Sequence, residues 1–146
     1  MFFSANWSYP TSVRFGAGRV KELADSCNEA GIKNPLLVTD RSLAKLPIAK
    51  KVVNILEKAG FKANLFCDVD QNPTEENLEK GLISFNQKNH DGVIGLGGGS
   101  AIDLSKMIAL MIDQKRPVWD FEDVSDWWRR ANAETIAPIV AVPTTA

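Results

Sequence analysis

The chain has 146 residues, of which 45% are hydrophobic and 24% charged, the composition of one ordinary globular domain. This composition excludes a disordered tail, a collagen-like repeat and a disulfide-dense miniprotein. With 17 basic and 18 acidic residues the formal net charge is -1, so the basic excess typical of a nucleic-acid-binding protein is missing. The longest apolar run, residues 107–112, is too short to span a bilayer.

The N-terminal segment and the two cysteines indicate in which compartment the protein is located. The first ten residues, MFFSANWSYP, have neither a basic region nor a long apolar stretch, so we predict no secretory signal. Cys27 and Cys67 are far apart in the sequence and suit free thiols in a reducing compartment better than a disulfide. We therefore expect a cytoplasmic protein that binds neither membranes nor nucleic acids.

Short apolar runs alternate with amphipathic segments along the chain. The run 13–15 leads into a glycine-containing turn at 16–18 and then into a helical pattern. Gly31 follows that helix in the place of a left-handed cap residue. Residues 35–40 are apolar and β-branched, which is typical of a strand buried on both faces of a parallel sheet.

Two further helices flank a third predicted strand. Pro47 suits the first position of a helix that Gly60 ends. Residues 61–69 are predicted to form the strand. Thr74 is predicted as the N-cap of the next helix, because two glutamates follow it and interact favourably with the helix dipole.

The second half of the chain is expected to contain two more strands. Residues 92–96 form one of them and run directly into a glycine-rich turn at 97–100. The helix predicted at 101–112 is apolar nearly all round, which indicates deep burial. Residues 119–130, rich in Trp and Asp, are predicted to be a long loop or an irregular helical excursion, and residues 136–142 a last strand.

This alternation predicts an α/β domain with a mostly parallel, Rossmann-like sheet and helices on both faces. In such sheets ligands bind beyond the carboxyl ends of the strands. Polar or glycine-rich residues fall at or just after four such ends: Asp40, Asn72, the turn Gly97–Ser100, and the pair Thr144 and Thr145. Their convergence on one sheet edge is the main functional signal in the sequence.

The glycine-rich turn predicts a phosphate or pyrophosphate site formed by Gly97, Gly98, Gly99 and Ser100. Glycines let a ligand approach the backbone closely, and the free N–H groups of a helix start favour an anion. The turn lacks the usual dinucleotide fingerprint, because Ser100 stands where its last glycine would be, and it is not a Walker A motif. The alternative is a tight strand-to-helix turn without a ligand.

Two acidic residues each have a functional and a structural interpretation. Asp40 suits the ribose hydroxyls of an adenosine, or a cap for the turn before Ser42. Asp103 lies one turn after the glycines, where it either faces a bound cofactor or compensates the helix N-terminus. Lys106 suits a surface position with its stem along the helix.

The sequence assigns no catalytic residue and no metal ligand. The single histidine, His90, lies in a polar stretch and is predicted to be a solvated loop residue. One histidine and two distant cysteines do not form a zinc-type cluster. The tryptophans suit a lid, a partner surface, or packing against structure outside this chain; they are Trp119, Trp127 and Trp128.

Residues 92–106, GVIGLGGGSAIDLSK, strongly resemble the Gly-Gly-Gly-Ser-x-x-Asp-x-x-Lys hallmark of the iron-containing (group III) alcohol dehydrogenases. Three other segments resemble that family in order and spacing. Residues 11–18 resemble its first strand and turn, residues 72–74 its Asn-Pro-Thr segment, and residues 143–146 the opening of its Pro-Thr-Thr motif. The resemblance covers essentially the whole chain.

The resemblance implies that residues 1–146 are the NAD(P)-binding domain of a longer enzyme, and that this chain stops within the Pro-Thr-Thr motif. The enzyme would transfer hydride reversibly between a small alcohol and an aldehyde or ketone. Iron or zinc would be held by one Asp and three His of a second, helical domain, for which this chain has no matching positions. We therefore expect this chain alone to be inactive, and the full-length protein to be a homo-oligomer.

The same resemblance implies roles for particular residues. Gly97–Ser100 would hold the pyrophosphate, Asp40 the adenosine ribose, and Asp103 would lie near the nicotinamide. Asn72, Thr144 and Thr145 would line the dinucleotide cleft. We predict NAD rather than NADP, because the carboxylate of Asp40 would repel a 2′-phosphate.

Two alternatives remain open at this point. One is the related glycerol dehydrogenase and dehydroquinate synthase group, which shares the fold and a glycine-rich turn. Ser100 and the segment 72–74 favour the alcohol dehydrogenases over this group. The other is a stand-alone nucleotide-binding module without catalysis.

Overall fold

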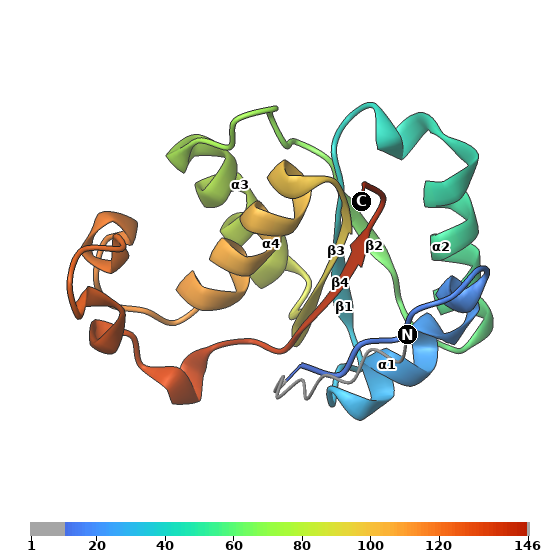
Figure 1. The fold of residues 1–146 in the computed structure, drawn as a ribbon, viewed down its shortest axis with the longest axis horizontal. Coiled ribbons are helices and arrows are strands. Elements are labelled where there is room, and N and C mark those ends of the chain that lie inside the picture. The colour runs from blue at the N-terminus through green and yellow to red at the C-terminus, as the bar shows by residue number, and fades with distance from the viewer. Residues whose placement is uncertain (1–10, 146) are drawn as a thin grey trace, which may run out of the picture.

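The computed structural model describes residues 11–145, and a parallel sheet lies at its centre (Figure 1). The sheet has four strands in the order β2-β1-β3-β4. The strands are β1 (Pro35–Val38), β2 (Asn64–Phe66), β3 (Gly92–Gly97) and β4 (Ile139–Pro143). Every neighbouring pair is parallel, so all four carboxyl ends meet at one edge.

Helices cover both faces of the sheet. In Figure 1, α1 (Leu23–Glu29) and α2 (Pro47–Lys58) lie on one side, and α3 (Glu75–Gln87) and α4 (Gly99–Met111) on the other. Parallel strands need crossover connections, and α2, α3 and α4 lie within these connections. The predicted Rossmann-like α/β fold is confirmed.

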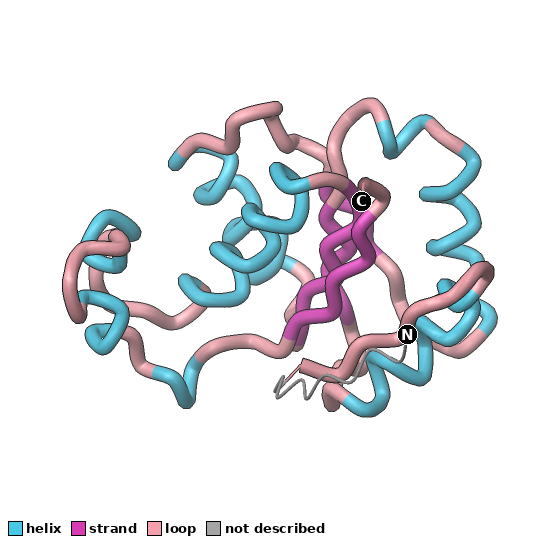
Figure 2. Tube along the Cα trace, viewed as in Figure 1, coloured by secondary structure: helices cyan, strands magenta, loops and turns pink. Residues whose placement is uncertain are grey.

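Short 3₁₀ helices complete the described chain (Figure 2). They are η1 (Arg19–Glu22), η2 (Leu43–Lys45), η3 (Val118–Phe121), η4 (Trp127–Arg130) and η5 (Ala133–Thr135). The irregular helical excursion predicted at 119–130 is confirmed. Gln114 closes its base, since the side-chain amide donates to the carbonyl oxygen of Asn132 at 3.0 Å and accepts from the Asn132 N–H at 2.9 Å.

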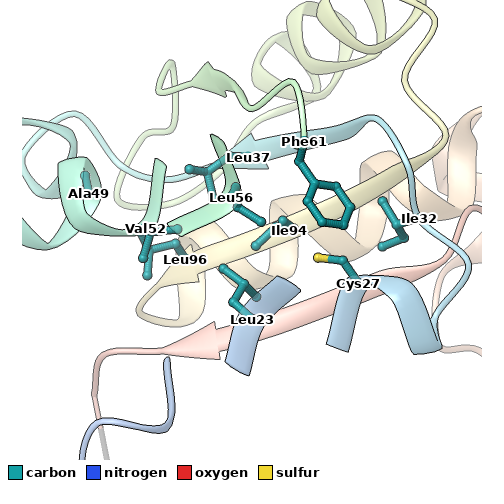
Figure 3. Close-up of a cluster of buried hydrophobic side chains, with 10 residues drawn as sticks. All are labelled: Leu23, Cys27, Ile32, Leu37, Ala49, Val52, Leu56, Phe61, Ile94 and Leu96. Carbon is teal, nitrogen blue, oxygen red and sulfur yellow. The ribbon is translucent and has the colours of Figure 1, made fainter. Parts of the chain in front are cut away.

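The two faces of the sheet form two hydrophobic clusters. Figure 3 shows the one beneath α1 and α2, where Leu37 of β1 and Ile94 of β3 meet Leu56 of α2. Leu36 and Val38 point the other way, into the cluster beneath α3 and α4. Every residue of β1 and β3 is buried, as the uninterrupted apolar runs predicted.

The helix ends follow the predicted local chemistry. Gly31 and Gly60 have φ of 76° and 90°, the left-handed conformation expected after a helix. Thr74 caps α3 through a reciprocal pair of bonds with Asn77. The N–H of Thr74 donates to Asn77 Oδ1 at 2.9 Å, and the N–H of Asn77 donates to Thr74 Oγ1 at 3.4 Å.

Several predicted boundaries were wrong. The strand expected at 61–69 spans only 64–66, because the short edge strand β2 pairs with β1 alone. Phe61 and Val69 are buried without pairing, so their apolar character reflects packing of the flanking loops. The last strand begins at residue 139, since 133–135 forms η5, and the last predicted helix begins two residues early, at Gly99.

The first strand that the resemblance implied within residues 11–18 is absent from the described part of the chain. Val13 and Phe15 are 71% and 91% exposed, and no described strand lies beside them. An extended apolar segment becomes a strand only when a neighbour accepts its backbone hydrogen bonds.

The two cysteines are free, as predicted, and burial raises the pKa of the Cys27 thiol to about 11. Across residues 11–145, no helix combines the length and the hydropathy needed to cross a membrane.

His90 is buried, which corrects its prediction as a solvated loop residue. It is 6% exposed and packs edge-on against Phe85, with ring centroids 5.8 Å apart. Asn89, with φ of 53°, turns the chain so that the imidazole points inward. Nδ1 lies 3.0 Å from the carbonyl oxygen of Asn34, and because a carbonyl only accepts, Nδ1 carries the proton of the neutral ring.

This burial predicts acid sensitivity between pH 7 and pH 5. Burial lowers the pKa of His90 below its ordinary value of 6.5. The unfolded chain therefore binds a proton that the folded chain resists, and the free energy of unfolding should fall as the pH drops below about 6.5. Denaturant titrations at several pH values should show this slope, and His90→Gln should flatten it.

Glu22 titrates in a lower pH range than His90 and does not interfere with this test. The hydrogen bond from Arg19 lowers the pKa of Glu22 to about 2, so the contribution of Glu22 is lost only below its ordinary value of 4.5. An unchanged slope between pH 7 and pH 5 in His90→Gln would show that His90 is not its cause.

Candidate functional site

The carboxyl ends of three strands bring most of the predicted site residues together. A Cβ placed on Gly97, at the end of β3, would lie 3.7 Å from Asp40 Oδ2, which follows β1. The N–H of Thr144, which follows β4, donates to the carbonyl oxygen of Gly97 at 2.9 Å. A Cβ on Gly98 would lie 3.7 Å from the side chain of Thr145. These contacts place Asp40, the glycine turn and both threonines around one edge.

The glycine turn has one position that requires glycine and another that is open. Gly97 has φ of +148°, and a Cβ there would lie 2.9 Å from the Cβ of Ala101. A Cβ on Gly99 would have no described atom within 4 Å. Gly97 therefore sets the turn, whereas Gly99 leaves open space above the start of α4.

The start of α4 presents backbone donors to that open space. Gly98 is the N-cap and supplies no side-chain cap, and the N–H of Ile102 makes the first bond of the helix, to the carbonyl oxygen of Gly98 at 3.1 Å. The preceding N–H groups of the first turn have no acceptor within the helix. Together with the helix dipole, they favour a negative charge.

The two interpretations of Asp40 apply to different oxygen atoms. Oδ1 accepts from the N–H groups of Ser42 at 2.9 Å and Leu43 at 2.8 Å, so it caps the turn that leads into η2. Oδ2 is the oxygen on the side of Gly97. One oxygen thus holds the loop, and the other faces the glycine turn.

Ser100 joins the glycine turn to the loop after β2. Its hydroxyl donates to the carbonyl oxygen of Gln71, next to the exposed Asn72. The predicted hydroxyl donor therefore already has an acceptor within the chain. The role of Gln71 had no signal in the sequence, because a backbone carbonyl carries no residue-type information.

Asp103 lies further along α4 than the glycine turn. Its side chain is 69% exposed and pairs with Lys106 at 3.2 Å. The predicted surface position of Lys106 is confirmed. α4 begins at Gly99 and its first turn carries no acidic residue, so Asp103 lies beyond the turn where the helix dipole acts most strongly.

An ion-pair network that begins at Arg41, the residue after Asp40, was not predicted from the sequence. The guanidinium of Arg41 pairs with Asp68 and with Asp70, which follow β2, and Lys80 of α3 also pairs with Asp68. An arginine directly after Asp40 and two acidic residues just past the next strand were the available signal.

Two surface grooves are lined by residues other than the predicted site residues. The larger, of about 470 Å³, runs along α2 and is lined by five lysines, and a smaller one of about 320 Å³ lies beside the excursion. The glycine turn lines neither of them. Within the described range 11–145, no three His, Cys, Asp or Glu side chains gather as a metal ion would require.

A parallel α/β sheet with a glycine-rich strand-to-helix turn at its carboxyl edge defines a Rossmann-like architecture, and in such sheets ligands bind at that edge. The family profile described as "Iron-containing alcohol dehydrogenase" matches residues 10–146. The chain therefore belongs to the iron-containing alcohol dehydrogenase family.

Individual relatives agree with this assignment. The chain is 34% identical to alcohol dehydrogenase 4 of Schizosaccharomyces pombe over 137 residues, which is 94% of this chain and 31% of that protein. The crystal structure of a 1,3-propanediol oxidoreductase matches with a TM-score of 0.78 and 30% identity, over 89% of this chain and 33% of that one. Sulfoacetaldehyde reductase from Bifidobacterium kashiwanohense, solved with NAD⁺, matches with a TM-score of 0.78 and 25% identity, over 97% of this chain and 37% of that one. The chain spans about a third of the length of the curated relatives it matches.

Proposed function

We propose that residues 1–146 are the NAD-binding part of a longer, metal-dependent alcohol dehydrogenase. That enzyme would transfer hydride reversibly between a small alcohol and an aldehyde or ketone. The observation that carries the proposal is the open start of α4, which lies at the same sheet edge as Asp40. Family membership and the NAD⁺ complex of a relative support the choice of cofactor.

The residues of the sheet edge fit the parts of a dinucleotide. The first-turn N–H groups of α4, at Gly99 and Ser100, would bind the pyrophosphate, with Gly97 and Gly98 keeping side chains out of its path. Asp40 Oδ2 would accept from the adenosine ribose hydroxyls. The remaining candidates would line the cleft: Asn72, Thr144 and Thr145, with Asp103 toward the nicotinamide.

The nicotinamide would supply the hydride chemistry when bound, and the protein part would position it. The iron or zinc of the family would be held by residues outside the described range, since that range gathers no metal-binding cluster. Cytoplasmic location, a small alcohol or aldehyde as substrate, and homo-oligomerisation of the full-length protein belong to the same proposal.

Nuclear magnetic resonance tests the proposed binding directly, because it detects weak ligands. Millimolar NAD added to the ¹⁵N-labelled chain should shift the amide signals of Gly97–Ser100. Gly99→Val should abolish these shifts while the domain stays folded, since a Cβ at this position meets no described atom within 4 Å. Shifts that persist unchanged in Gly99→Val would place the ligand elsewhere.

Asp40→Asn is expected to narrow the preference for NAD over NADP. Two unit charges about 4 Å apart repel by about 1 kcal/mol in bulk water and by about 4 kcal/mol at an effective dielectric constant of 20. The asparagine keeps an oxygen for the N–H groups of Ser42 and Leu43 but removes the charge. Dissociation constants for both cofactors, measured by calorimetry, would contradict the proposal if the wild-type values were equal.

A further inference from the structure

The guanidinium of Arg41 forms ion pairs with the loop after β2. Arg41 directly follows Asp40 at the carboxyl end of β1. In dinucleotide-binding folds, an arginine near the ribose-binding acid accommodates a 2′-phosphate. Here both terminal nitrogens of the guanidinium are engaged by the loop after β2, with Nη1 3.1 Å from Asp70 Oδ1 and Nη2 on Asp68 Oδ1.

The two carboxylates that hold Arg41 are themselves fixed. The other oxygen of Asp70 accepts from Asn77 Nδ2 at 3.1 Å, and the other oxygen of Asp68 lies 3.0 Å from Lys80 Nζ. Asn77 is 1% exposed and also donates to the backbone carbonyl of Asp68 at 3.1 Å. Each carboxylate oxygen therefore has its own partner, and one buried amide ties both residues to the start of α3.

This arrangement has a direct electrostatic consequence for the cofactor. A 2′-phosphate beside Asp40 would need a nearby cation to offset the repulsion between the two anions. Arginine binds phosphate well because its planar fork donates two parallel hydrogen bonds. Arg41 is the arginine next to Asp40, but its fork is already used by two carboxylates that bring further negative charge to the same edge.

We infer that Asp68 and Asp70 determine cofactor specificity by holding Arg41 away from a 2′-phosphate. This inference rests on the proposed NAD site, and it adds a second device to the charge of Asp40. Asp40 acts on the phosphate directly, whereas Asp68 and Asp70 act through Arg41 and are positioning residues.

The test compares three variants by the ratio of the NADP and NAD dissociation constants. Asp68→Asn/Asp70→Asn should release Arg41 and lower this ratio at least about fivefold in favour of NADP. The asparagines keep oxygen acceptors for Asn77 and Lys80, so the loop is retained. The triple variant, with Arg41→Gln added, should return the ratio to the wild-type value.

The triple variant distinguishes two causes of tighter NADP binding: the release of Arg41, and the change in electrostatic potential when two negative charges are removed. Removing two negative charges favours any anion at this edge, with or without Arg41. A gain in NADP binding that survives Arg41→Gln would therefore overturn the inference, and so would an unchanged ratio in the double variant. Glu76→Gln is the matched control, because Glu76 pairs with Lys80 at 2.7 Å and not with Arg41; it should leave the ratio unchanged.

The single variants and the NAD titration distinguish misfolding, failure of the proposed function and failure of this inference. If the double variant does not fold, the single variants Asp68→Asn and Asp70→Asn should each move the ratio in the same direction by a smaller factor. If wild-type protein shows no NAD-induced shifts at Gly97–Ser100, the proposed function fails and this inference with it. If NAD binds there but the ratio does not respond to Arg41, only the inference fails.

Discussion

Gly97→Ala is expected to destabilise the domain by about 3 kcal/mol, from backbone strain and overpacking together. The φ of +148° at Gly97 is a conformation that residues with a side chain rarely adopt. The added Cβ would also lie 2.9 Å from the Cβ of Ala101, which belongs to the first turn of α4 and is buried. Relief would require α4 to move away from β3. Denaturant unfolding of the purified chain, followed by circular dichroism, measures the change.

Gly99→Ala is the matched control for this prediction. It makes the same chemical change two residues further on, where the Cβ meets no described atom and φ is not positive. We expect its free energy of unfolding to stay within about 0.5 kcal/mol of wild type, or to rise slightly because alanine favours helix. Equal losses in the two variants would mean that the turn is not set by the backbone of Gly97.

This chain, purified alone, is expected to show no metal-dependent oxidation of alcohols and no stoichiometric iron or zinc. It contains a single histidine, which is buried against Phe85, and residues 11–145 gather no metal-binding cluster. The donors at the glycine turn remain, so NAD should bind, but weakly. The assay follows NADH absorbance with simple alcohols and added iron or zinc, alongside elemental analysis.

The outcome that contradicts this prediction is specific. Turnover that a chelator abolishes, together with one metal ion per chain, would place a complete active site within these residues. Wild-type NAD shifts without turnover would instead match a cofactor-binding part that requires further chain for catalysis.

The sequence by itself determined the elements whose signals are local. Continuous apolar runs marked β1 and β3, because a strand buried on both faces needs apolar side chains on each. Gly31, Gly60 and Thr74 marked helix ends, because their effect depends only on φ or on a bond spanning three residues. The glycine turn and its neighbouring motifs were sufficient to identify the family.

Only the tertiary structure decided which of these elements and residues meet. The apolar run at 13–15 looked like a strand, but strand formation depends on a partner that no described segment provides. His90 stood among polar neighbours, yet the turn at Asn89 carries it into the interior beside Phe85. The polar neighbours of His90 in the sequence therefore did not predict its burial, which depends on packing against Phe85.

The candidate site was likewise predicted in part from the sequence and in part visible only in the tertiary structure. Its expected position at the carboxyl edge followed from the predicted parallel sheet, in which the carboxyl ends of the strands meet at one edge. The use of each oxygen of Asp40, the Ser100 bond to Gln71 and the engagement of Arg41 by Asp68 and Asp70 did not. The last two join residues 27 to 29 positions apart. Such contacts form because the crossover helices bring neighbouring loops side by side. The spacing of residues within one short segment does not show which distant loops meet.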